Sequence, residues 1–281
     1  MPTEIGQVEA IFRYPVKSMA GERLEAAELG WHGFAGDRRL ALRRVNDRGG
    51  FPFLTASRLP ELVLFEPLRL DADNESVSPL TRLESSSDVT GGLRPRLTSS
   101  RRVAAGLPDI PTDGELPTHI RTPEGAELPV FGEELAAEIA RRFGSPVEMM
   151  QMKHGIFDEA SVSVIAGDTV REIGLLAGRE LDVRRFRPNI VVRLLRPGAF
   201  QEDEWLGGTL RFGEGEDAAV ISVTMRDERC AMVNIDPDSA SLAPEVMKAI
   251  VRERQNYAGV YATVTRTGRV AVGQKVWWSR G

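Results

Sequence analysis

The chain contains one cysteine, Cys230, and its neighbours leave two kinds of chemistry open. It follows an apolar, strand-like run over residues 218–224, and Arg226 and Arg229 stand close to it in the sequence. A free cysteine most often fills a small apolar gap in a core, where it is inert. An ionised thiolate instead acts as a nucleophile or binds a metal, and nearby arginines stabilise that charged form. The two acidic residues between the arginines also argue against a fully buried segment.

Five polar or cationic residues stand next to other predicted strand ends and could share one ligand with this thiol. They are Lys17, Ser18, Arg38, Arg187 and Asn189. Arginine and lysine make charge-assisted hydrogen bonds to phosphate, and the arginine fork does so with two donors. Serine and asparagine supply neutral hydrogen bonds to the edge of a heterocycle. Because a thiolate prefers soft metals, an anionic ligand that carries a phosphate and a thiophilic metal would explain the whole set.

A simpler interpretation of the cations is that they lie in solvent. Arginines after strands commonly pair with surface acids, which suits Arg184 and Arg185, and Lys17 alone would more often be exposed than buried. Arg187 differs from them, because the Pro-Asn turn that follows it leads into an apolar strand and fixes the preceding side chain.

The composition bounds the class of protein. With 281 residues the chain is long enough for one large domain or two ordinary ones, and two are favoured. Its 42% hydrophobic and 27% charged residues are typical of a soluble globular protein, and a net charge of −5 gives no basic field for nucleic acid or a membrane surface. A single cysteine excludes an intrachain disulfide and any Cys-x-x-Cys metal or iron–sulfur site. No signal peptide or membrane-spanning run is visible, so a reducing, cytoplasmic location is expected.

The elements that must position these residues are mostly short strands in the first half of the chain. Alternating or apolar runs predict strands over residues 7–14, 24–29, 39–45 and 62–65. A glycine-containing turn over 46–50 predicts a hairpin. Residues 71–118 have weak periodicity and predict long loops with short strands. A short hairpin predicted over 121–130 marks the seam between two domains.

The second half of the chain carries the predicted helices. Residues 133–143 have an apolar face at helical spacing and stop before a glycine, and residues 244–254 begin with proline. Asp168 is predicted to cap a third, short helix. Strands are predicted over residues 147–152, 162–165, 188–195, 209–212, 218–224, 257–265 and 269–278. The last two are predicted to pair with each other as a hairpin.

Many short strands and few helices predict an α+β, β-rich fold built from β-barrels rather than a doubly wound sheet. The expected parts are an N-terminal β-barrel-like domain over residues 1–125 and a second β-barrel with a few peripheral helices over residues 126–281. Common catalytic motifs are missing. Residues 268–275 approach a phosphate-binding P-loop but have Gln274 where lysine is required, and the three histidines stand at no metal-ligand spacing.

Four motifs occur in one order along the chain: Tyr14-Pro-Val-Lys-Ser18, Gly36-Asp-Arg38, Phe186-Arg-Pro-Asn189, and Arg229-Cys230 with Asp236-Pro-Asp238. Together they resemble the MOSC family (molybdenum-cofactor sulfurase C-terminal domain), in the two-part form that has an N-terminal MOSC β-barrel. The chain looks most like the amidoxime-reducing members of mitochondria and their bacterial relatives. The resemblance covers nearly the whole chain, from about Val8 to Trp277.

The resemblance implies a molybdenum cofactor, a molybdopterin that carries molybdenum, held between the two β-rich parts. It implies that the Cys230 thiolate binds the metal and takes part in catalysis. By motif match, the residues that would hold the pterin and its phosphate are Lys17, Ser18, Arg38, Arg187 and Asn189. A family loop near the metal matches residues 157–161, with Asp158 as its catalytic acid and Ser161 as a cofactor contact. Glu159-Ala160 stands where relatives can have Thr-Ser, so the surroundings of the metal are expected to differ.

The activity that the resemblance implies is the reduction of small N-hydroxylated or N-oxide substrates, with the cofactor supplying the redox chemistry. A separate electron-donor protein, a flavin or iron–sulfur reductase, is expected as a partner, because no cysteines are left for a cluster. An alternative is a carrier of the molybdenum cofactor, or a sulfur-transfer protein with a persulfide on Cys230, that turns over no substrate of its own. A third interpretation is a β-barrel binding domain with an inert cysteine.

Overall fold

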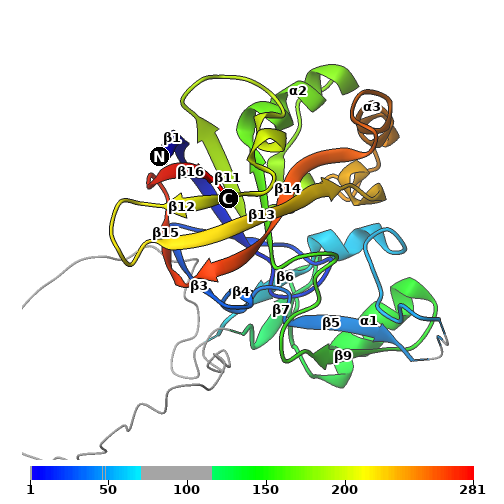
Figure 1. Cartoon of the computed structure of the whole chain (residues 1–281). Coiled ribbons are helices and arrows are strands. Elements are labelled where there is room, and N and C mark those ends of the chain that lie inside the picture. Colours follow the sequence, from blue (N-terminus) through cyan, green and yellow to red (C-terminus); the bar gives the residue numbers. More distant parts are fainter. Residues whose placement is uncertain (1, 46, 48, 71–115) are drawn as a thin grey trace, which may run out of the picture.

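The computed structural model describes residues 2–45, 47, 49–70 and 116–281. Most of the loop region predicted over 71–118, and residues 46 and 48 of the predicted turn, therefore lie outside the described residues. The chain forms a β-barrel that carries two helices, with a smaller second lobe beside it (Figure 1). The second lobe consists of the described residues from 40 to 70 and from 116 to 151.

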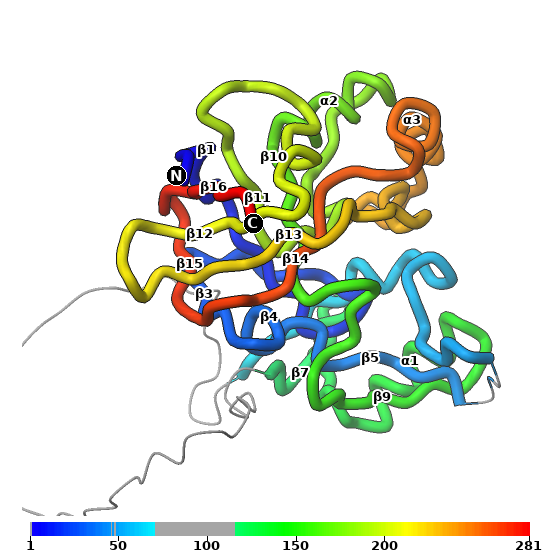
Figure 2. The backbone as a smooth tube through the Cα atoms, in the orientation of Figure 1, coloured from blue at the N-terminus to red at the C-terminus, as the bar shows by residue number. Residues whose placement is uncertain are grey.

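Seven strands close the barrel, because the first strand pairs on both of its sides. β1 (Thr3–Arg13) runs antiparallel to β11 (Ile190–Leu194) on one side and to β16 (Lys275–Arg280) on the other. From β16 round to β11 the order is β12 (Gly208–Phe212), β13 (Ala219–Glu228), β14 (Tyr257–Arg266) and β10 (Val162–Ala166). β2 (Glu22–Leu24) extends the sheet beyond β1. Figure 2 shows how the blue first strand lies among strands from the end of the chain.

Aliphatic side chains fill the inside of the barrel. Each of its strands contributes at least one side chain with no exposed surface: Val8, Val164, Ile190, Leu210, Ile221, Val260 and Val276. Alternate residues of a barrel strand point inward, so this pattern produces a packed core and not a channel. Polar chemistry is therefore left to the ends of the strands.

Two helices pack against the outside of the barrel. α2 (Gly167–Ala177) ends at Gly178, whose φ of 70° suits glycine, and α3 (Pro244–Arg254) begins with proline. Their buried side chains form a core with the barrel: Ile173, Val246, Ile250 and, from the loop before β11, Phe186. Asp168 is not the cap of α2, which corrects the prediction. It lies inside the first turn, where its carboxylate accepts a hydrogen bond from the backbone N–H of Gly198.

The second lobe has an apolar core of its own. β5 (Leu40–Arg44) pairs with β9 (Val147–Gln151), and α1 (Glu133–Phe143) packs against β9. A small sheet consists of β6 (Glu66–Leu68), β7 (His119–Arg121) and β8 (Glu127–Pro129). The buried side chains of this core include Leu42, Leu62, Phe65, Ile120, Leu135 and Ile139.

The predicted fold class is confirmed. The described residues are rich in strands, contain three α-helices and close a β-barrel, and α1 and α3 have the predicted bounds. The domain boundary between residues 125 and 126 stays a prediction, and pairings of β1 with β11 and of β5 with β9 join the two sides of it. In the described part of the chain, no helix has the length and apolar composition that a membrane crossing requires.

The predicted strand over residues 62–65 is wrong. Pro60–Leu64 form a 3₁₀ helix, η1, with proline in its first turn and with Leu62 and Val63 both buried. A strand would have turned these two consecutive apolar side chains to opposite faces. The short helix buries both against the second lobe.

The predicted hairpin between residues 257–265 and 269–278 is also wrong. β15 (Gly268–Ala271) pairs with β3 (Ala26–Gly30), which in turn pairs with β4 (Gly33–Phe34). β16 pairs with β12 and β1. Closure of the barrel gives these late strands partners from the start of the chain, and local turn signals cannot reveal such distant pairing.

Candidate functional site

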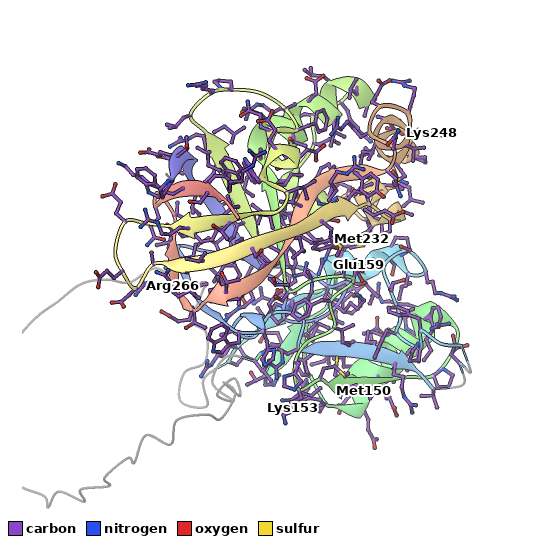
Figure 3. All side chains as sticks on the ribbon, in the orientation of Figure 1. Met150, Lys153, Glu159, Met232, Lys248 and Arg266 are labelled. Carbon is purple, nitrogen blue, oxygen red and sulfur yellow. The ribbon has the colours of Figure 1, made fainter. Side chains whose placement is uncertain are left out.

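A cavity of about 280 Å³ lies where the barrel meets the second lobe. Side chains from β10, β13 and β14 form one wall, and residues between 51 and 57 form part of the other. Figure 3 shows Met232, a lining residue, at this junction. Six of the residues predicted from the sequence line the cavity: Lys17, Ser18, Arg38, Asp158, Arg187 and Cys230.

Cys230 is exposed at this cavity. β13 runs on to Glu228, further than predicted, and its pairing with β14 contains a bulge between Arg226 and Glu228. A bulge redirects the side chains at a strand end. Here it leaves Asp227 buried, against the expectation from its charge, while Glu228 and Cys230 stay open. The thiol therefore does not fill an apolar gap.

Two buried arginines hold the backbone on either side of Cys230. Arg229 donates hydrogen bonds to the carbonyl oxygens of Ala258 and Phe186, at 2.6 and 2.8 Å. Arg185 donates to the carbonyl oxygen of Asn234 at 3.1 Å and to the carboxylate of Asp236 at 2.6 Å. Because these partners lie on different strands and loops, the thiol is carried on a fixed stretch of backbone.

The two arginines expected to stabilise the thiolate have different positions. Arg226 lies over the ring of Tyr257, 4.0 Å from its centroid, and does not line the cavity. Arg229 does line the cavity, but its Nη2 lies 2.7 Å from a carboxylate oxygen of Asp227. The positive field near the thiol therefore comes from cations that are distant in the sequence.

Lys17 is buried and lines the cavity, so it is not the solvent-exposed lysine of the simpler interpretation. Its side chain is held by Asp158, whose Oδ1 accepts a hydrogen bond from Nζ at 2.8 Å. Burial opposes the charge on Asp158, but Lys17 outweighs it and holds the pKa of this carboxyl below its usual range. The loop with Asp158 is thereby tied to the loop that follows β1.

Three of the cavity residues have a left-handed backbone without being glycine. Ser18, Arg38 and Arg187 have φ angles of 70°, 50° and 47°. Such conformations are unfavourable for residues with a Cβ, and proteins keep them mostly at functional sites. All three angles turn polar side chains toward the same cavity.

Arg38 and Arg187 meet in the wall of the cavity. Arg38 Nη2 donates a hydrogen bond to the carbonyl oxygen of Arg187 at 2.9 Å, and Arg38 Nη1 pairs with Asp37. Arg187 Nη1 donates to the carbonyl oxygen of Met19 at 2.7 Å. The two guanidinium groups therefore come together although 149 residues separate them in the sequence.

Arg187 has no carboxylate of the described residues in direct contact with its guanidinium group. It forms no ion pair with any described residue, and its Nη2 is buried without a hydrogen-bond partner among them. Burial lowers the pKa of Arg187 to about 10, so the group stays protonated in neutral solution. An unpaired buried cation is costly, and a bound anion would satisfy both its charge and its free donor.

Asn189 and Ser161 do not line the cavity. Asn189 is buried behind it, where its Nδ2 donates to Asp37 at 3.0 Å and its Oδ1 accepts from the backbone N–H of Ser163 at 3.1 Å. Ser161 packs against Gly33, whose missing Cβ would lie 2.7 Å from the Ser161 carbonyl oxygen. Contacts of these two residues with a cofactor stay predictions.

Several lining residues escaped the sequence analysis. Thr55 and Ser57 bring hydroxyl groups from the second lobe, and Ser163 and Tyr261 line the barrel side. They belong to no motif, and only the folded chain brings them to the cavity. Outside it, the rings of His32 and His154 lie 4.4 Å apart, although their sequence positions suggested isolated histidines.

Comparison with known families identifies the chain. The family described as MOSC domain matches residues 151–277, and the MOSC N-terminal beta barrel domain matches residues 5–91. The chain belongs to the MOSC family. MOSC domains are associated with proteins of the molybdenum cofactor. The match agrees with the family resemblance of the four sequence motifs, and residues from these motifs line the cavity.

Solved structures related to this MOSC protein are distant. The YUAD protein from Bacillus subtilis is 14% identical with a TM-score of 0.46, and the alignment covers 99% of this chain and 98% of that one. YiiM from Geobacillus stearothermophilus is 18% identical with a TM-score of 0.34, covering 43% of this chain and 54% of that one. Scores this low support no argument about function. No curated protein matches the chain.

The residues of the MOSC cavity fit the cofactor that the family implies. The unpaired donor of Arg187 suits a phosphate, and the exposed thiol of Cys230 suits a soft metal. Within the described residues, no three histidine, cysteine, aspartate or glutamate side chains gather as a metal site. Cys230 is thus the side chain in this cavity that a soft metal would prefer.

Proposed function

We propose that this MOSC protein is a molybdenum-cofactor-dependent oxidoreductase that reduces N-hydroxylated or N-oxide compounds, with the Cys230 thiolate as the protein ligand of molybdenum. The observation that supports it is the sharing of one cavity by the exposed thiol and three cations, Lys17, Arg38 and Arg187. An anionic cofactor with a thiophilic metal would pair its anionic groups with the three cations and its metal with the thiol.

The chain's own residues would divide the work of binding. Arg187 offers its unpaired donor to the phosphate, and Arg38, fixed by Asp37, adds a second guanidinium group beside it. Lys17 and Ser18 would contact the pterin from the loop after β1. When bound, the cofactor supplies two-electron redox chemistry. Cys230 would hold its metal where the thiol is exposed, within reach of a substrate.

The substrate would meet a mixed apolar and acidic surface near the thiol. Phe51 and Met232 line the cavity, and Phe51 is 48% exposed. Asp158 and Glu228 add carboxylates. The apolar part of this surface suits a molecule with an apolar body.

Electrons would come from a separate protein. The chain has a single cysteine, which the metal would occupy, so it holds no ligands for an iron–sulfur cluster. We therefore propose a flavin or iron–sulfur reductase as the partner, in the reducing compartment of the cytoplasm. No nucleic acid or membrane partner is required by this activity.

Metal and pterin analysis of freshly purified protein, alongside Cys230→Ala, tests this proposal. Wild-type protein should contain molybdenum and pterin and should oxidise a reduced viologen when an N-hydroxylated amidine is added. The variant should lose both the activity and much of the metal. A Cys230→Ala protein with full metal content and full activity would defeat the proposal.

The exposure of Cys230 also suits the alternative, a carrier of the cofactor or of persulfide sulfur. The same assay separates the two. A carrier would exchange cofactor or sulfur with an acceptor protein and would leave the viologen reduced, however much cofactor it held.

A further inference from the structure

Asp227 is a buried carboxyl group of the cavity wall with no role in the binding scheme above. It lies on β13, three residues before Cys230, and is 1% exposed. Its Oδ2 accepts a hydrogen bond from Ser163 Oγ at 2.8 Å and lies 2.7 Å from Arg229 Nη2. Its Oδ1 is buried and has no hydrogen-bond partner among the described residues. Buried acceptors are almost always paired, so an unpaired one in a cavity wall is available to a water molecule or a ligand.

The groups that face this carboxyl come from every neighbouring element. They are Arg229 after β13, Ser163 on β10, Tyr261 on β14, Asp158 before β10, and Arg38 after β4. Burial raises the pKa of Asp227 to about 6, and the charge of Asp158 acts in the same direction. Arg229, Ser163 and Arg38 act against burial. The carboxyl can therefore take up and release a proton close to neutral pH, as a general acid must.

The other carboxyl groups of the wall are less suited to this work. Asp158 is tied to Lys17, which holds its pKa below the usual range and keeps it ionised. Glu228 is exposed, and its carboxylate accepts a hydrogen bond from Asn256 Nδ2 at 3.2 Å. Asp227 is buried, and its Oδ1 accepts no hydrogen bond from any described residue.

We propose that Asp227 is a catalytic residue that donates a proton to the oxygen leaving an N-hydroxylated substrate, an assignment that rests on the proposed function. In that reaction the substrate R–NH–OH takes up two electrons and two protons, and the products are R–NH₂ and water. The N–O bond breaks, an N–H bond forms, and the nitrogen is reduced. The electrons come from the reductase or, in the assay, from reduced viologen. Asp227 supplies one proton through Oδ1 and is reprotonated by water that enters the cavity, and water supplies the other proton.

The test compares wild-type protein with Asp227→Asn, both loaded with cofactor, in the viologen assay with an N-hydroxylated amidine. Asparagine keeps the shape and can still accept from Ser163, but it cannot donate a proton of comparable acidity. We expect kcat to fall by about 100-fold or more with pterin per chain unchanged. Wild-type kcat should fall as the pH rises above about 6, and this limb should be absent from the variant. Asp238→Asn is the matched control, because Asp238 is an exposed partner of Arg184 outside the cavity.

Ser163→Ala provides a second test, in which the pH dependence of kcat is measured with the Asp227 carboxyl still present. Its hydroxyl lowers the pKa of Asp227, so its removal should move the falling limb of kcat to higher pH. If Asp227→Asn loses its cofactor, this movement alone supports the assignment and an unmoved limb overturns it. An Asp227→Asn protein with wild-type kcat and pH profile overturns the assignment and leaves the proposed function standing. A loaded wild-type protein that reduces no N-hydroxylated compound overturns both.

Discussion

Arg187 lies over the ring of Tyr14, with its guanidinium carbon 4.1 Å from the ring centroid. Arg38 approaches the same ring at 5.0 Å. Tyr14 is buried directly after β1, so the end of the first barrel strand orients these two of the guanidinium groups that line the cavity. Cation–π contacts of this kind fix an arginine without neutralising its charge. The ring of Tyr14 thus orients the guanidinium groups of Arg38 and Arg187, and the charge of Arg187 stays available to a ligand.

Replacement of Arg187 by alanine should weaken cofactor binding. Loss of one charge-assisted contact of about 1.5–3 kcal/mol corresponds to a fall in affinity of roughly 10- to 150-fold. Arg187→Lys should recover only part of this, because lysine keeps the charge but has neither the fork nor the planar stack on Tyr14. Pterin bound per chain measures the effect.

Arg184→Ala is the control for that series, since Arg184 pairs with Asp182 and Asp238 away from the cavity. It should bind the cofactor as wild type does. Equal pterin content in Arg187→Ala and Arg184→Ala would contradict the role given to Arg187.

Arg185→Ala should loosen the segment that carries Cys230. Arg185 is 5% exposed and pairs with Asp236, whose side chain is 30% exposed, so the loss should stay below the about 3–5 kcal/mol that removal of one partner of a fully buried pair costs. We expect a lower unfolding free energy and faster amide hydrogen exchange over residues 230–236. Protection in that segment equal to wild type would mean that other contacts hold the thiol in place.

Gly259→Ala should disturb Arg229. Gly259 has a φ of 83°, and an added Cβ would lie 2.9 Å from both Arg229 Nη2 and the carbonyl oxygen of Val164. Gly178→Ala is a matched control, with a φ of 70° and no atom near the added carbon. Backbone strain alone should cost about 1–2 kcal/mol in the control, and the clash should add to it in Gly259→Ala. Equal losses in chemical denaturation would show that the contact with Arg229 is unimportant.

Glu202 should make the protein less stable in alkaline solution. Burial raises the pKa of this carboxyl from 4.5 to about 7, while Thr169 donates a hydrogen bond to it at 2.9 Å. The native state therefore favours the neutral acid, and this stability, present below about pH 4.5, is lost as the pH rises through about 7. The difference amounts to about 3 kcal/mol.

Glu202→Gln should accordingly be more stable than wild type at about pH 8.5 and nearly equal to it at about pH 5, as thermal unfolding would show. Glu204→Gln changes an exposed carboxyl two residues further on and should have no such pH dependence. A stability gain for Glu202→Gln that is the same at both pH values would contradict the proton linkage.

Local signals in the sequence were sufficient for α1 and α3. α1 ends before Gly144, which has a left-handed φ of 81°, and α3 starts at Pro244, where a missing N–H costs nothing. The pairing of β15 with β3 could not be read in the same way, because its partner is some 240 residues earlier and no turn links the two.

In the predicted site, too, some features could be predicted from the sequence and others depend on residues that are distant in it. The motifs of the family resemblance picked out Lys17, Arg38, Arg187 and Cys230, which all line one cavity, while their roles toward a cofactor stay predictions. The burial of Lys17 depends on Asp158, 141 residues away, so its own neighbours favoured an exposed side chain. Asp227 likewise stands among charged residues, and it is buried at a bulge in β13 that the sequence did not reveal.

X-ray absorption at the molybdenum edge, on loaded wild-type protein and on loaded Cys230→Ser, tests the central claim most directly. Serine keeps the side chain's size and removes its sulfur. If the thiolate in this cavity binds the metal, the variant will show one sulfur neighbour fewer around molybdenum, with an oxygen or nitrogen in its place. The same number of sulfur neighbours in both proteins would contradict the assignment of Cys230.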